Sequence, residues 1–499
     1  MSSTCTSRTI RCSCCSADDR SPSHTVHHPR PLPLSPTSSE PHRGGVNATG
    51  LRRRALRASV YTLAAYGLSQ GIRLSSNLIL TRLLVPDMFG VMAIALVLIT
   101  GLALFSDIGL SQIVVQHRQG AEARFSDTVW SLQTLRGLAI GIVVLALACL
   151  LHCASTLGWV PAGSVYANPL LPLIVGVLAL SPIVGGLEST KAALARRELA
   201  VGSVARLELG SQLIGSICTI GLAVVSQSIW ALVAGAIASV TARTVMSHTT
   251  LPGAANRWHW DLPTIREILR FGKWIVLSSI LGFLAMNSDR LLLGALVDSD
   301  SLGLYAIALL ILGAIQSALS KLGSGVALPL FSEVARNDAS NLRNVYYRAR
   351  APLDAALLFA AGLLFSGGTA IIHALYDNRY GGAGPILEVV GLCLIASRYE
   401  LVDQCFLALG KPRVLNLPIL CRILAFYIIV PLAYRGFGFE GAVWGIAASA
   451  FAGVPVSLVL MKRHGLLSLS RELLPLPVFL IGMGCGSLAS LAPRLLSLH

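Results

Sequence analysis

Long apolar runs recur along almost the whole chain, and they limit its fold more than any other feature. We identify twelve clear runs and a weaker thirteenth, at residues 59–82, 88–108, 128–151, 168–187, 207–226, 229–247, 271–297, 302–330, 353–376, 384–409, 414–434, 441–461 and 473–492. A helix that crosses a bilayer needs about 20 predominantly apolar residues. Only 13% of the 499 residues are charged, whereas soluble domains carry about 25%. The sequence therefore predicts an all-α polytopic membrane protein and excludes a water-soluble globule.

The two ends of the chain depart from this pattern. Residues 1–50 are dominated by Ser, Thr, Pro and His, so we expect a disordered tail. This tail lacks the basic start and apolar stretch of a secretory signal, and a translation start nearer Val46 or Leu51 is an alternative. The last apolar run contains Pro and several Gly residues, which favours a short, kinked or partly interfacial segment.

The loops between the runs alternate in charge, and this alternation predicts the orientation. One set of loops is rich in Lys and Arg, including Arg118, Arg124, Lys191, Arg196, Arg197, Arg257, Arg266, Arg270, Arg336, Arg343, Arg348, Arg350, Lys411, Arg413, Lys462, Arg463 and Arg471. The other set holds little beyond Arg82, Arg379 and Arg435. Cytoplasmic loops carry the excess of basic residues, so the first set and the N-terminus are expected in the cytoplasm. The net charge of +15 is then mostly a topology signal, and we expect no nucleic-acid partner.

An internal repeat divides the chain into two halves. Residues 77–96 (NLILTRLLVPDMFGVMAIAL) align with residues 289–309 (DRLLLGALVDSDSLGLYAIAL) with a single one-residue gap. Six runs separate equivalent points of the two copies, and both copies start in a helix that leaves the cytoplasm. A parallel repeat of this kind predicts two pseudo-symmetric six-helix bundles around a central cavity.

These patterns predict the domain boundaries. The N-terminal bundle spans residues 51–250 and the C-terminal bundle spans residues 271–465, with an additional membrane segment at 466–499. Residues 251–270 form a cytoplasmic linker, in which Trp258 and Trp260 are expected to anchor an interfacial amphipathic helix.

A few polar side chains fall inside the apolar runs, where an ionisable group costs about 2.5–3.5 kcal/mol. Gln70, Arg73 and Asn77 are spaced by three and four residues in the first run, so they share one helix face. Arg73 lies roughly 21 Å from the cytoplasmic end at about 1.5 Å per residue. One interpretation is that Arg73 lines a polar cavity. The other is that it forms an interhelical ion pair or snorkels to the outer surface of the membrane.

The second half supplies a matching set of charges. Asp289 and Arg290 occupy the corresponding place in the seventh run, where Asp289 aligns with Asn77. Arg398, Glu400 and Asp403 lie in the tenth run. Arg398 either serves a cavity or pairs locally, with Glu400 or with a neighbouring helix.

Enzyme motifs do not fit their context in this chain. Residues 67–71 (GLSQG) match the G-x-S-x-G pattern of serine hydrolases, but they lie inside a predicted membrane helix and not on a strand-to-helix turn. The chain contains no Walker A, HExxH or zinc-ligand pattern. We expect no catalytic residues, no metal and no cofactor.

Several segments in order resemble one family of membrane transporters. They are residues 107–111 (DIGLS), 114–118 (VVQHR), 128–130 (TVW), 193–199 (ALARREL), 289–294 (DRLLLG) and 303–305 (GLY). Together they resemble Wzx-type polysaccharide repeat-unit flippases, of the multidrug/oligosaccharidyl-lipid/polysaccharide exporter superfamily. The resemblance extends over about residues 55–465 and is greatest to exopolysaccharide exporters of the xanthan-like type.

The resemblance implies a cargo and a mechanism. The cargo would be an undecaprenyl-pyrophosphate-linked oligosaccharide, flipped by alternating access across the bacterial inner membrane in a pathway with polymerase and export proteins. A pyrophosphate crossing a low-dielectric midplane needs fixed cations. We expect Arg73, Arg290 and Arg398 to supply them and Gln70 and Asn77 to line the same surface, while Asp289, Glu400 or Asp403 couples transport to ions.

Two other functions compete with this one. A multidrug exporter of the same superfamily would need an anionic cavity for cationic drugs, and Arg73 argues against one. A membrane polymerase or glycosyltransferase would need a catalytic external loop, yet the longest one predicted, residues 152–167, contains no Lys, Arg, Asp or Glu.

Overall fold

The computed structural model describes residues 48–198 and 200–496, and all regular structure in these ranges is helical. Contacts divide the chain into two compact units, Met1–Leu51 and Arg52–His499. The predicted disorder of the tail concerns residues that lie almost wholly outside the described ranges. Apart from the first residues of α1, the elements below belong to the second unit.

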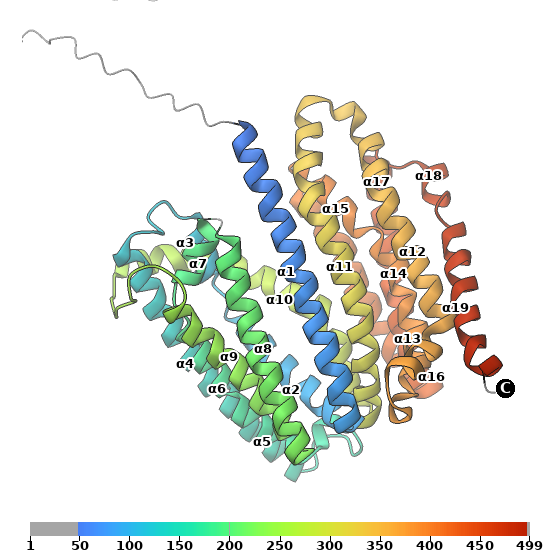
Figure 1. Cartoon of the computed structure of the whole chain (residues 1–499), viewed down its shortest axis with the longest axis horizontal. Helices are drawn as coiled ribbons and strands as arrows, with labels where there is room; N and C mark the ends of the chain where they lie inside the picture. The colour runs from blue at the N-terminus through green and yellow to red at the C-terminus, as the bar shows by residue number, and fades with distance from the viewer. Residues whose placement is uncertain (1–47, 199, 497–499) are drawn as a thin grey trace, which may run out of the picture. The chain divides into compact units, whose positions relative to one another are not determined.

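The first half consists of long helices joined by shorter ones. Its elements are α1 (Ala48–Leu83), α2 (Pro86–Phe105), α3 (Leu110–Gln116), α4 (Ala123–Thr156), η1 (Val165–Ala167), α5 (Leu170–Leu178), α6 (Leu180–Gly186), α7 (Lys191–Arg197), α8 (Val201–Ser226) and α9 (Trp230–Thr249). The predicted run 168–187 is broken into α5 and α6. Figure 1 shows α8 beside α9 and α4 beside α6, as the contacts between these pairs require.

The second half repeats this plan with longer helices. Its elements are α10 (Leu262–Leu296), α11 (Ser299–Asn337), η2 (Ala339–Asn341), α12 (Leu342–Leu375), η3 (Asn378–Tyr380), α13 (Ala383–Gly391), α14 (Cys393–Ser397), α15 (Glu400–Ala408), η4 (Pro412–Leu415), α16 (Asn416–Phe451), α17 (Gly453–Arg463), α18 (Leu469–Leu473) and α19 (Pro477–Leu496). The predicted run 384–409 is therefore three short helices.

Nine helices in the described ranges are long and apolar enough to cross a membrane, or ten if Leu170–Gly186 and Lys191–Arg197, which are bent by 58°, count as one span. The sequence predicts thirteen apolar runs, which is more than the number of these helices. The difference between the two numbers has local causes. Residues 416–463 hold two predicted runs in one helical stretch, which bends at Gly438 (φ 62°, ψ −145°). A positive φ of this kind favours glycine.

The two copies of the repeat meet in the middle of the protein. The first copy spans the α1–α2 turn and the second spans the α10–α11 turn, and α2 packs along α11. The largest apolar core draws on both copies, with Val91 and Ile94 from the first and Leu293, Leu302 and Tyr305 from the second. Burial of these side chains between the halves is the main apolar contribution to their association.

The last apolar segment forms a helix, α19, that packs closely along α12 (Figure 1). Small residues allow this approach: a Cβ added to Gly362 would lie 2.1 Å from the Phe479 carbonyl oxygen. A Cβ added to Gly482 would lie 2.2 Å from the Phe359 carbonyl oxygen. Close backbone approach at small residues is typical of helix pairs in membranes, so α19 joins the C-terminal bundle as an additional helix.

The linker contains no separate interfacial helix in the structure. Residues 251–261 are irregular, and the helix that begins at Leu262 continues into the seventh span as α10. Asp261 caps it by accepting from the Thr264 hydroxyl and its backbone N–H, and these bonds lower the pKa of the Asp261 carboxyl because they favour its charged form. Trp258 and Trp260 are exposed and pack edge to face against each other.

Candidate functional site

The polar face of α1 is largely free of contacts with other helices. Asn77 donates to the Arg73 carbonyl oxygen at 3.0 Å, and Gln70 donates to the Tyr66 hydroxyl at 2.6 Å. The Arg73 side chain is exposed and makes no hydrogen bond or ion pair within the described ranges. The neighbouring Ser69 bonds to Gln212 of α8 at 2.6 Å. The helix is thus held through other residues, and the Arg73 guanidinium remains available for a ligand.

Asp289 and Arg290 in α10 have different surroundings. The Asp289 carboxylate accepts from the Tyr305 hydroxyl at 2.7 Å and from the Arg290 backbone N–H at 2.8 Å. The Arg290 guanidinium is half-buried, and its Nε is fully buried without a hydrogen-bond partner in the described part of the protein. A buried donor that lacks a partner costs about 1–3 kcal/mol, and more when it is charged. Arg290 is therefore a cation with an unsatisfied buried donor in the described part of the protein.

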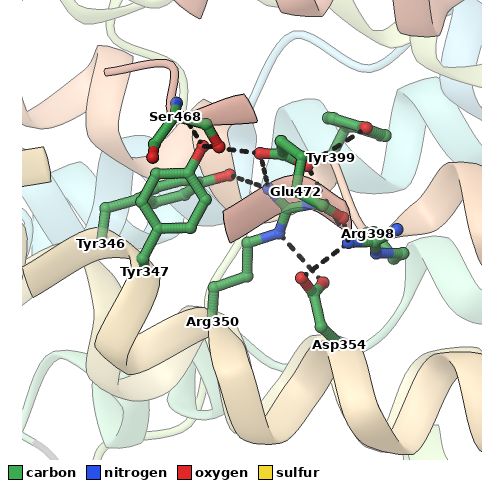
Figure 2. A network of polar contacts seen from close by, with 8 residues as sticks. All are labelled: Tyr346, Tyr347, Arg350, Asp354, Arg398, Tyr399, Ser468 and Glu472. Carbon is green, nitrogen blue, oxygen red and sulfur yellow. Dashed lines mark hydrogen bonds and ion pairs between the residues drawn. The ribbon is translucent and has the colours of Figure 1, made fainter. Parts of the chain in front are cut away.

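Arg398 lies instead in a buried ion network of the second half (Figure 2). Its guanidinium contacts a carboxylate oxygen of Asp354 at 3.0 Å and lies 3.9 Å from one of Glu472. Arg350, which is 1% exposed, binds the same two carboxylates at 3.0 and 2.7 Å. Two cations and two anions thus balance among side chains that are all nearly buried.

Tyrosines complete the network. Tyr347 donates to Glu472 at 2.8 Å and Tyr399 does so at 3.3 Å, while the Tyr346 hydroxyl accepts from Arg350 at 3.0 Å. A buried ion pair offsets its desolvation only when its remaining donors and acceptors are also satisfied. These hydroxyls supply part of that requirement, and Figure 2 shows the Tyr347 and Tyr399 hydroxyls bonded to Glu472 and the Tyr346 hydroxyl bonded to Arg350.

The network connects three segments that are distant in sequence. Arg350 and Asp354 lie one turn apart on α12, Arg398 follows α14, and Glu472 comes from α18. Sequence reasoning placed Arg350 in a cytoplasmic loop and missed Asp354 and Glu472. The i,i+4 spacing of Arg350 and Asp354 was the available signal; nothing in the sequence connected either residue to Glu472.

This placement separates Arg398 from the other two predicted cations. Asp354 and Glu472 neutralise Arg398, and it pairs with neither Glu400 nor any residue of α1 in the described ranges. The expectation that Arg398 holds substrate pyrophosphate does not suit this geometry. The contacts agree better with the alternative, in which Arg398 pairs with a neighbouring helix. Its partners lie on α12 and α18.

Glu400 lies beside the network at a small polar cavity. The cavity holds about 60 Å³ and is lined by Gln316, Arg350, Asp354 and Glu400 among others. Gln316 donates to Glu400 at 3.2 Å. Asp403, one turn further on, is half-buried and makes no hydrogen bond or ion pair with a described residue. The volume suits water or a small cation, since one water occupies about 30 Å³ of the liquid.

Three of the segments that carry the family resemblance, at residues 107–111, 114–118 and 193–198, lie close together beyond the end of α2. Asp107 accepts from the Gly109 backbone N–H at 3.0 Å, and Gly109 has φ 71°, a left-handed conformation that suits glycine. Arg197 from α7 donates to the Val114 carbonyl oxygen at 2.9 Å and ties α7 to α3. These residues position the ends of helices, and Asp107, Val114 and Ala193 also line a cavity of about 260 Å³.

The comparison with known sequences identifies the family. Residues 79–383 match the family described as "Polysaccharide biosynthesis protein". The chain is 22% identical over 400 residues to lipopolysaccharide biosynthesis protein WzxC of Escherichia coli K12, covering 79% of this chain and 77% of WzxC. It is also 22% identical over 296 residues to teichuronic acid biosynthesis protein TuaB of Bacillus subtilis 168, covering 57% of each protein.

Solved structures show the same fold. An inward-facing multidrug resistance transporter of the MATE family, in the MOP superfamily, matches 82% of this chain and 98% of its own with a TM-score of 0.63. Lipid II flippase MurJ, in an inward closed conformation, matches 91% of this chain and all of its own with a TM-score of 0.54. Both are 13% identical to it. The predicted all-α polytopic fold is thus confirmed. Because the family match extends over more than half of the chain, the protein belongs to the polysaccharide biosynthesis family, as a transporter of the Wzx flippase type.

Proposed function

We propose that this protein flips an undecaprenyl-pyrophosphate-linked oligosaccharide repeat unit across the bacterial inner membrane for exopolysaccharide synthesis. Membership of a polysaccharide biosynthesis family supports this, as do the names of WzxC and TuaB. The observation that carries it is the half-buried guanidinium of Arg290, whose Nε has no hydrogen-bond partner among the described residues. A cargo with a pyrophosphate group would supply that partner.

The electrostatic reason concerns the midplane of the bilayer. A pyrophosphate loses its hydration there, and fixed cations replace part of the lost interaction. Arg73 and Arg290 are our two candidates, since neither guanidinium is hydrogen-bonded or ion-paired within the described ranges. Gln70 and Asn77 share the polar face of α1 and would contact the sugar, while the polyprenyl chain stays in lipid.

We assign Arg398 a supporting part in this transport. Its ion pairs with Asp354 and Glu472 hold α14 and α18 against α12. Glu400 is a coupling candidate because it lines the small polar cavity, and Asp403 is another because it lies one turn further along α15. Asp289 is a third through its bond to Tyr305. Protonation or ion binding at one of these carboxylates would change its contacts between the two orientations of the transporter.

The proposed orientation places the N-terminus and the basic loops in the cytoplasm. The α1–α2 and α10–α11 turns then face outward. Several bonds join the halves at this end, including those from the Val165 amide to the Val297 carbonyl oxygen at 3.1 Å and from the Tyr380 hydroxyl to the Leu84 carbonyl oxygen at 2.8 Å. Polymerase and export proteins would receive the cargo on that side.

A gene deletion tests this function directly. The deletion strain should lose the secreted polymer and accumulate lipid-linked repeat units on the inner leaflet, and the native gene should reverse both effects. Leaflet location can be measured by the accessibility of the sugar to an enzyme added to spheroplasts. Normal secretion, or loss of secretion without lipid-linked intermediates, would contradict the proposal. Altered drug resistance with normal secretion would favour a multidrug exporter.

A further inference from the structure

A polar hollow opens where three loops of the second half meet. It has a volume of about 310 Å³, and its walls come from the start of α12, the loop after α15 and the end of α17. Arg343, Lys411, Arg463 and His464 line it, together with apolar residues that include Leu342 and Leu466. No Asp or Glu is among the described residues that line it.

The cations of this hollow converge without an anionic partner among the described residues. Arg343, Lys411 and Arg463 are exposed and make no hydrogen bond or ion pair with any described residue. Elsewhere the basic side chains near polar cavities have carboxylate partners, as in the pair of Arg243 with Glu188 at 3.1 Å. Three like charges that converge without an anion repel one another, and an anionic ligand would relieve that repulsion.

His464 supplies a second, independent observation. Its Nε2 is buried and has no hydrogen-bond partner in the described part of the protein, and its ring lies edge-on to Phe406 at 5.4 Å. A buried ring nitrogen normally has a partner. A ligand oxygen in the hollow would provide an acceptor for it.

We propose that this hollow binds the phosphate group of an anionic phospholipid. The three cations lie in loops of the basic set, which we place at the cytoplasmic surface, and basic pockets between helices at that surface suit phospholipid headgroups. Leu409, which is half-buried, also lines the hollow, so apolar surface adjoins the charge. The site is separate from Arg73 and Arg290 in sequence and in contacts.

Two lipids supply a phosphate group to such a hollow. One is a bilayer phospholipid, through its headgroup, and the other is the transported lipid, through its pyrophosphate. The test uses the full-length protein in detergent and measures binding of phosphatidylglycerol, phosphatidylcholine and inorganic pyrophosphate by native mass spectrometry and thermal shift. We expect retention of phosphatidylglycerol over phosphatidylcholine and no competition by pyrophosphate at equal concentration. Binding of pyrophosphate without preference for phosphatidylglycerol would overturn the assignment to a phospholipid.

Substitutions locate the binding. The triple change Arg343→Gln, Lys411→Gln and Arg463→Gln should weaken phosphatidylglycerol binding by at least about tenfold, since each basic residue near the surface contributes on the order of 1 kcal/mol. The matched control is Arg118→Gln, Arg336→Gln and Arg348→Gln, which removes three exposed cations that lie outside the hollow and whose side chains pair with no described residue.

A charge-preserving variant, Arg343→Lys with Lys411→Arg and Arg463→Lys, should retain binding and so separates loss of the site from misfolding. Equal loss of binding in the triple variant and its control would show diffuse attraction and would overturn the proposal. Unchanged binding in the triple variant would do the same.

Discussion

Gly90 and Gly303 occupy equivalent positions in the internal repeat, and each contacts the first residue of the helix that carries the other. A Cβ added to Gly90 would lie 2.0 Å from the Ser299 carbonyl oxygen, and one added to Gly303 would lie 2.0 Å from the Pro86 carbonyl oxygen. The two contacts are therefore related by the pseudo-symmetry of the repeat. They bring α2 and α11 together at the end where the halves are bonded.

Replacing either glycine should separate these helices. We expect Gly90→Ala and Gly303→Ala each to lower the free energy of unfolding by about 1–3 kcal/mol, because a backbone oxygen cannot move aside without shifting its helix. Thermal unfolding of the purified protein measures this effect. Gly313→Ala, also on α11, is the control because an added Cβ there meets no atom within 4 Å. Equal melting temperatures for Gly303→Ala and Gly313→Ala would show that the close contact contributes nothing.

The buried network predicts that acidic residues of the second half differ strongly in their contribution to the stability of the protein. Asp354→Asn should destabilise the protein by about 3–5 kcal/mol, because the change leaves Arg350 and Arg398 without one of their two shared anions. Glu472→Gln should have a similar effect. Glu333→Gln removes an exposed carboxylate on α11 that has no partner in the part of the chain that the structure describes, and it serves as the control. Unfolding midpoints that do not distinguish Asp354→Asn from this control would contradict the network.

The docking of α19 on α12 can be tested with two glycines of one helix. Gly482→Ala introduces a Cβ 2.2 Å from the Phe359 carbonyl oxygen, whereas Gly484→Ala meets no atom within 4 Å. The first change should lower the unfolding midpoint and increase proteolysis near residue 474, and the second should not. The expected loss is about 1–3 kcal/mol. If both variants behave alike, α19 does not pack as described.

Substitution of Arg290 should impair transport without lowering the stability of the protein. Arg290→Ala removes a guanidinium whose Nε is buried without a partner in the described ranges, so the unfolding midpoint should stay constant or rise. Polymer secretion should nevertheless fall to background. A matched pair on α1, Arg73→Ala and Arg82→Ala, should show loss of secretion only for Arg73, with membrane abundance checked by immunoblot. Secretion by Arg73→Ala at the level of Arg82→Ala would exclude Arg73 from the cargo site.

Much of the fold followed from local sequence patterns. Apolar runs located most of the membrane helices, and the repeat around Gly90 and Gly303 indicated two related halves. The run at 384–409 was harder to interpret, because a broken helix and a continuous one have similar hydropathy. The helix after Asp261 was also mistaken for a separate interfacial element, since its amphipathic start gives no sign that it continues into α10.

The site was less predictable because ion pairs join residues that are distant in sequence. Arg398 was recognised as a charge inside a span, but its partner Glu472 is 74 residues away, and only the packing of α18 brings them together. Arg290 stays a predicted site residue, proposed because its neighbour Asp289 aligns with Asn77 in the repeat. Sequence indicates which charges are costly, and the folded chain decides which of them are neutralised.

The most direct test of the account is flipping by the purified protein in proteoliposomes. The vesicles would contain an undecaprenyl-pyrophosphate-linked oligosaccharide, and transfer between leaflets would be followed by the accessibility of the sugar to an external enzyme. The account predicts equal rates for the native protein and Arg82→Ala. It predicts at least about tenfold slower transfer by Arg290→Ala, the loss expected for one charge-assisted hydrogen bond. Transfer by Arg290→Ala at the native rate would contradict the central claim.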